Sequence, residues 1–131
     1  MNGPTLLLVA AALAFAVGLA HSILGEKFIL MRLFRRPDLP KLLGGTEFTV
    51  RTLRFAWHLT TIAWWGSGAL LVLASRGALD PASTLQVLAV TMLTTSVAIV
   101  VASRGRHLAW PVFAAIGLIA LYAASLGTLA R

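Results

Sequence analysis

Apolar residues along the chain gather into long runs that short polar stretches separate. The runs cover about residues 5–24, 55–74, 81–103 and 108–130. Each holds roughly the 20 residues that cross a hydrocarbon layer of about 30 Å at 1.5 Å per residue. The runs do not alternate polar and apolar positions as a membrane barrel strand would. The pattern predicts an all-α polytopic membrane protein, with four transmembrane helices in an antiparallel bundle that forms one domain over residues 1–131.

Local signals mark several helix ends. Asp80 followed by Pro81 is typical of an N-cap with proline at the first helical position, so the third helix is expected to begin there. The run GGT at 44–46 predicts a helix stop and a new start, which extends the second helix by a turn or two at one end. The opening MNGPT has no lysine or arginine. We therefore expect the first run to be a retained span rather than a signal peptide.

Charge is sparse and unevenly placed. Only 11% of the residues are charged, against about 25% in a soluble domain, and the net charge is +7. Most lysines and arginines fall in the first loop, residues 25–54, or in the third. These are Lys27, Arg32, Arg35, Arg36, Lys41, Arg51, Arg54, Arg104 and Arg106. Only Arg76 and Arg131 lie elsewhere. The bias predicts that the first and third loops are cytoplasmic and that both termini lie outside. It also predicts that the basic residues meet the anionic headgroups of a bacterial inner membrane and do not bind nucleic acid.

The first loop and two helix faces point to further contacts. The segment FILMRLFRR mixes apolar and basic residues, which predicts either a basic helix lying along the headgroups or a continuation of the first helix. The first helix has a stripe of small residues at four-residue spacing that leads to a carboxylate: Ala10, Ala14, Gly18, Ser22 and then Glu26. The fourth helix has a similar small-residue stripe. Such stripes let helices approach closely in lipid. The surplus of packing faces predicts a homo-oligomer or a partner membrane subunit.

The histidines flank the predicted cytoplasmic loops. His21 lies about one turn before the first helix ends, His58 about one turn inside the second apolar run, and His107 at the start of the fourth helix. Because the first and third loops emerge on one side, we expect the three imidazoles at a similar depth.

The second helix carries a polar stripe at three- and four-residue spacing. Its members are Arg51, Arg54, His58, Thr61 and Trp65. A stripe of this kind should face protein or water rather than lipid. The first helix presents His21 and Glu26, and the loop is long enough for the two helices to pack as neighbours. Glu26 is therefore expected to pair with Arg54 or Arg51.

Three interpretations of this cluster remain open. It can simply lock helix ends together. It can bind a metal ion, a proton or a small ion, since imidazoles and a carboxylate suit transition metals; the candidate metal ligands are His21, Glu26, His58 and His107. It can also hold haem b, with His21 and His58 as axial ligands.

The remaining chemistry narrows the function. The chain has no cysteine and shows no nucleophile elbow, phosphate loop or paired carboxylates, which argues against an enzyme. Trp57 and Trp110 are expected as interface anchors, while Trp64 and Trp65 should pack in the core or line a ligand wall. The sequence favours a binding or transport module that uses the polar cluster. The alternative is an accessory or structural subunit without chemistry of its own.

Overall fold

The structure is a computed structural model that describes residues 2–129. Its described part is helical apart from short connections. The elements are α1 (Gly3–Gly25), the π-helical turn η1 (Glu26–Leu30), α2 (Met31–Leu33), α3 (Glu47–Ser75), α4 (Pro81–Ser103) and α5 (Trp110–Leu129). The all-α fold expected from the apolar runs is confirmed.

The first helix is longer than the first apolar run. α1, η1 and α2 follow one another without a break over Gly3–Leu33. Of the two possibilities for the basic segment, a continuation of the first helix is the one observed. The irregular connection is therefore residues 34–46, not 25–54 as the charge pattern indicated. Neither proline nor glycine interrupts residues 26–36, so backbone hydrogen bonding continues past the end of the apolar run.

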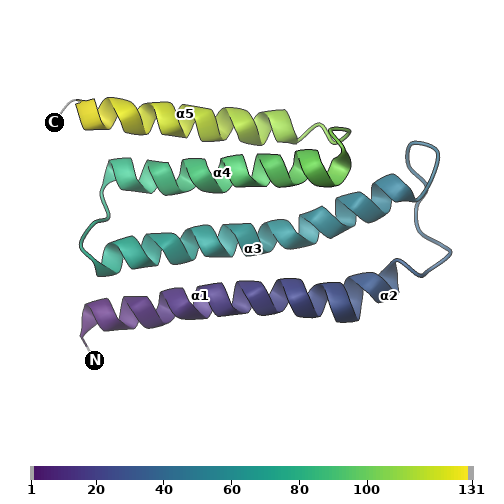
Figure 1. Cartoon of the computed structure of the whole chain (residues 1–131), viewed down its shortest axis with the longest axis horizontal. Helices are drawn as coiled ribbons and strands as arrows, with labels where there is room; N and C mark the ends of the chain where they lie inside the picture. The colour runs from purple at the N-terminus through teal and green to yellow at the C-terminus, as the bar shows by residue number, and fades with distance from the viewer. Residues whose placement is uncertain (1, 130–131) are drawn as a thin grey trace.

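The long helices lie side by side in a single row, in the order α1, α3, α4, α5 (Figure 1). Each helix runs antiparallel to its neighbour. The 34–46 connection joins the helices at one of their ends, and the N- and C-terminal ends of the described chain lie at the other (Figure 1). Among the described residues, substantial contacts between long helices join only α1 with α3, α3 with α4, and α4 with α5. Among the described residues α1 and α5 lie at opposite edges of the row, so the predicted four-helix bundle is not confirmed.

Three helical segments are long and apolar enough to cross a membrane: Gly3–Leu33, Pro81–Ser103 and Trp110–Gly127. By length and composition they fit an integral membrane protein. α3 has 29 residues but is not one of the three. His58 and several threonines, tryptophans and glycines interrupt its apolar positions, which lowers its mean hydropathy.

The helix starts follow local chemistry to different degrees. At α4 the Asp80 side chain accepts from the Ser83 N–H at 2.7 Å, and the Ser83 hydroxyl accepts from the Asp80 N–H at 2.9 Å. This reciprocal pair is a capping box, and the predicted start at Pro81 is confirmed. Thr46 precedes α3 as expected, but its side chain makes no capping bond.

Glycines allow the aromatic side chains of α3 to approach α1. A Cβ atom on Gly18 would lie 2.7 Å from Trp65 Nε1, and one on Gly25 would overlap the indole of Trp57. Both glycines are buried. Without a hydrophobic driving force between helices in lipid, this close packing is a main source of their association.

Replacing Gly25 with alanine should therefore separate α1 from α3. We expect Gly25→Ala to lower the free energy of unfolding by about 1–3 kcal/mol, the usual cost of overpacking. Thermal unfolding in detergent measures this. Gly127→Ala is the matched control, because a Cβ atom there meets nothing within 4 Å. Equal melting temperatures for the two variants would contradict the close packing.

Candidate functional site

A chain of hydrogen bonds crosses the α1–α3 interface and has a defined direction. The Thr61 hydroxyl donates to the Gly18 carbonyl at 3.0 Å, so it must accept from Ser22, whose hydroxyl lies 2.7 Å away. Ser22 has then used its only proton. It therefore accepts at 2.8 Å from Nδ1 of His58, which fixes the proton of that imidazole on Nδ1.

The other nitrogen of His58 faces Glu26. Nε2 of His58 lies 3.5 Å from Oε2 of Glu26, and Oε1 of Glu26 lies 3.1 Å from Nη2 of Arg54. Oε2 of Glu26 is buried and has no hydrogen-bond partner. Of the two arginines expected to pair with Glu26, Arg54 does so. Glu26, Arg54 and His58, with Ser22 and Thr61 behind them, are called the Glu26 cluster below.

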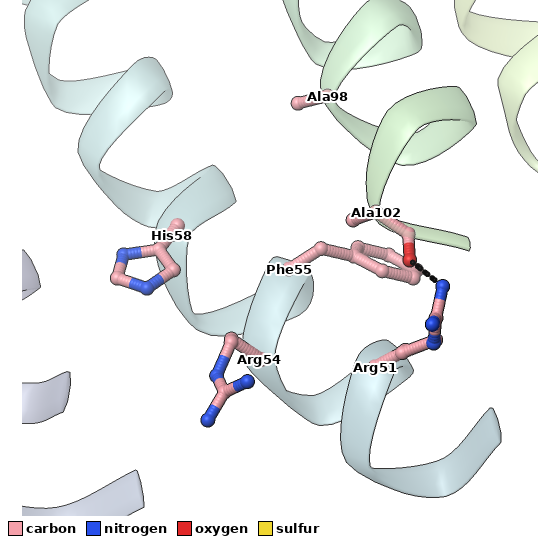
Figure 2. Close-up of a pocket in the computed structure, with 6 residues that line it drawn as sticks. All are labelled: Arg51, Arg54, Phe55, His58, Ala98 and Ala102. Carbon is pink, nitrogen blue, oxygen red and sulfur yellow. Dashed lines mark hydrogen bonds between the residues drawn. The ribbon is translucent and has the colours of Figure 1, made fainter. Parts of the chain in front are cut away.

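Arg51 points away from this cluster, toward α4. Its guanidinium donates to Glu47 at 2.7 Å and to the Ala102 carbonyl at 3.4 Å. Figure 2 shows Arg51 reaching Ala102 while Arg54 and His58 point to the opposite side of Phe55. Arg51 therefore joins α3 to α4, whereas Arg54 joins α3 to α1.

His21 belongs to an aromatic group and not to the Glu26 cluster. Its Nε2 lies 3.3 Å from the Trp57 carbonyl, and Trp57 Nε1 donates back to the His21 carbonyl at 3.1 Å. The two rings are parallel with centroids 4.5 Å apart, and Trp64 meets His21 edge-on at 5.0 Å. Trp57 was expected to anchor the protein at the membrane surface, but it packs between α1 and α3. Trp64 packs against His21.

The last two candidates lie farther away. Trp65 Nε1 donates to the Phe15 carbonyl at 3.1 Å, nearer the middle of α1, and the Trp65 side chain is partly exposed. His107 packs against Phe48 and Phe55 of α3, with centroids 6.1 and 5.0 Å away, and its Nδ1 accepts from the Ala109 N–H. His107 therefore closes the turn between α4 and α5.

The candidate metal ligands do not gather. Within residues 2–129, no three histidine, cysteine, aspartate or glutamate side chains could hold one metal ion. Only Glu26 and His58 face each other, while His21 and His107 pack against aromatic rings elsewhere. A transition-metal site built from these four side chains is not supported.

The axial pair suggested for haem b is also divided. His58 borders a cavity of about 450 Å³ between α3 and α4 (Figure 2). His21 borders a different cavity, of about 480 Å³, which Trp57 and Trp64 line with residues of α1 and η1. Trp57 and His58 are consecutive, so their side chains leave α3 about 100° apart. The two imidazoles do not face one shared space, and they do not fit a haem held between them.

Two contacts at the α1–α3 interface were not predicted from the sequence. Ser22 is the residue that meets His58, and Trp57 is the residue that holds His21. Ser22 belongs to the stripe that contains Gly18, and the stripe predicts a packing position for Ser22 but not its contact with His58. The carbonyl and ring contacts of Trp57 leave no comparable signal.

The chain matches no family model, no curated protein and no solved structure. Its function is therefore inferred from geometry.

The shared hydroxyl of Ser22 is a direct test of the hydrogen-bond chain. We expect Ser22→Ala to lower the free energy of unfolding by about 0.6–1.7 kcal/mol, the range for interhelical hydrogen bonds in membranes. Thermal unfolding with Ser67→Ala as control measures it, because the exposed Ser67 hydroxyl bonds only within its own helix, to the Ala63 carbonyl. A loss no larger than that of the control would remove Ser22 from the interface.

Proposed function

We propose that the protein is a small integral membrane binding module of the bacterial inner membrane, and that its Glu26 cluster takes up a proton from the cytoplasmic side. The four long helices span the membrane, both termini lie outside, and the 34–46 connection and the α4–α5 turn are cytoplasmic. The concentration of lysine and arginine at the helix ends near the 34–46 connection and the α4–α5 turn supports this orientation.

The facing pair of Glu26 and His58 carries the proposal. Since Nδ1 of His58 already holds a proton for Ser22, Nε2 and Oε2 of Glu26 can bond only if one further proton lies between them. That proton gives either a histidinium beside a carboxylate or a neutral imidazole beside a carboxylic acid. Without it, two acceptors face each other at 3.5 Å and Oε2 remains unsatisfied.

The surroundings favour a proton over a metal or another cation. Arg54 holds a positive charge 3.1 Å from Glu26, which disfavours binding of a metal ion at the same carboxylate. The chain of bonds ends at the Gly18 carbonyl, within the α1–α3 interface. Uptake and release at one end, rather than passage across the membrane, is the activity that this arrangement supports.

The open row favours a second candidate, an accessory role in a larger membrane assembly or a homo-oligomer. α1 and α5 form the edges, and both carry exposed large apolar side chains such as Leu13 and Ile119. Lipid or a further helix can cover these edges. Copurification from native membranes and the size of the detergent-solubilised particle distinguish a partner subunit or oligomer from a lone chain.

Infrared difference spectra between neutral and acidic pH test proton uptake. We expect a carboxyl band that Glu26→Gln abolishes and that His58→Ala shifts. Glu47→Gln is the control: Glu47 is paired with Arg51 but its side chain is 66% exposed, so it should not affect this band. A band that survives Glu26→Gln unchanged would overturn the proposal.

The metal and haem alternatives need a separate measurement on the purified protein. We expect no stoichiometric metal and no Soret band. A metal that disappears in His58→Ala, or a Soret band that disappears in both His21→Ala and His58→Ala, would instead establish a metal or haem site. A control variant, His107→Ala, shows whether such a loss is specific.

A further inference from the structure

Arginines surround a small cavity where the ends of α3 and α4 meet, apart from the Glu26 cluster. The cavity has a volume of about 50 Å³, which limits its occupant to a small group. Its lining residues are Glu47, Phe48, Arg51, Ser103, Arg104 and Arg106.

The charge of this arginine cavity is not balanced. Glu47 is the only acidic residue that lines it, and its carboxylate is paired with Arg51 at 2.7 Å. Neither Arg104 nor Arg106 forms an ion pair within the described part of the chain. Two guanidinium groups therefore remain available to an anion.

The backbone that carries these arginines is held in an unusual conformation. Arg104 ends α4 with a φ of 53°, in the left-handed region where glycine is normally preferred, and Gly105 follows with a φ of 75°. The turn is fixed because the Ser103 hydroxyl accepts from the His107 N–H at 3.3 Å and His107 packs on Phe55. The backbone at Arg104 and Arg106 is thus set by the fold in advance of binding, and both side chains are exposed.

An apolar cavity adjoins the arginine cavity on the membrane side. It has a volume of about 450 Å³, and Arg51 borders both cavities. Its other lining residues are Phe55, Ala98 and Ala102, with Arg54 and His58 of the Glu26 cluster. Figure 2 shows Phe55, Ala98 and Ala102 around it, with Arg51 beside Ala102. Phe55 lies one helical turn deeper along α3 than Arg51, and Ala98 lies about one turn deeper along α4 than Ser103. The α3–α4 interface is therefore basic at its end and apolar farther in.

We propose that these two neighbouring cavities, which share Arg51, together bind an anionic phospholipid from the leaflet on the side of the 34–46 connection. The phosphate lies among Arg51, Arg104 and Arg106, whose guanidinium groups donate to its oxygens. Part of one acyl chain occupies the apolar cavity beside Phe55 and Ala98. Arg54 and His58 of the Glu26 cluster also line the larger cavity. The lipid contacts proposed here are those of Arg51, Arg104, Arg106, Phe55 and Ala98 and need no proton at Glu26, so either proposal can fail alone.

Native mass spectrometry of the purified full chain tests the headgroup contacts. The probes are phosphatidylglycerol, phosphatidylcholine and inorganic phosphate. We expect phosphatidylglycerol to bind best, and Arg104→Gln/Arg106→Gln to weaken it at least about tenfold. The control is Arg32→Gln/Arg35→Gln, which removes the same charge from exposed positions away from the α3–α4 interface. Should the double variant not fold, the single variant Arg106→Gln is measured against Arg35→Gln.

Filling the apolar cavity tests the acyl-chain contact without changing charge. We expect Ala98→Leu to weaken phosphatidylglycerol binding several-fold, and Ala12→Leu, at an exposed position on α1, to leave it unchanged. Three results would overturn the proposal. The first is that Arg32→Gln/Arg35→Gln weakens phosphatidylglycerol binding as much as Arg104→Gln/Arg106→Gln does. The second is that phosphatidylcholine binds as tightly as phosphatidylglycerol. The third is that inorganic phosphate at matched concentration displaces the lipid while Ala98→Leu has no effect on lipid binding. The last result would identify a site for a free oxyanion.

Discussion

Glu26 directly follows the apolar helix α1. Hydrocarbon would offer its carboxylate no partner, and α3 supplies one. Arg54 and His58 do so, and they fix the register of the whole α1–α3 interface. Each step of three or four residues back along α1, from Glu26 through Ser22 and Gly18 to Phe15, meets a similar step forward along α3. The partners in that order are Arg54, His58, Thr61 and Trp65. Gly18 and Gly25 make this antiparallel register possible by letting the indoles of α3 approach α1.

α3 then serves as the polar helix of the row. Its side toward α1 carries the Glu26 cluster, while Arg51 turns to α4 and borders the arginine cavity. The end of α3 therefore borders two chemically different sites. On one side His58 faces the carboxylate of Glu26, and on the other Arg51 borders the arginine cavity, where Arg104 and Arg106 form no ion pair among the described residues. The same polar residues lower the hydropathy of α3 below that of its neighbours. The proposed sites for proton uptake and for lipid binding both use polar residues of α3, and these residues make α3 less apolar than the other long helices.

The sequence predicted the helices well because their signals are local. Asp80 and Pro81 define the start of α4, and the apolar runs define most of the rest. The order of the helices in the row could not be predicted. Small-residue stripes indicate that a helix can approach another closely, but they do not indicate which helix is its neighbour. Equal depth also did not mean a shared site. His21 and Ser22 are consecutive, so they leave α1 about 100° apart, and it is Ser22 that reaches His58.

A charge exchange between positions 26 and 54 tests whether the Glu26–Arg54 pair fixes the register of α1 against α3. The melting temperatures of Glu26→Arg, Arg54→Glu and the double variant are compared in the same detergent. If the pair fixes the register, each single variant melts well below the wild type, because it places like charges together. The double variant should recover most of that loss. A double variant whose loss equals the sum of the two single losses would contradict the account, since it would show that the two residues do not interact.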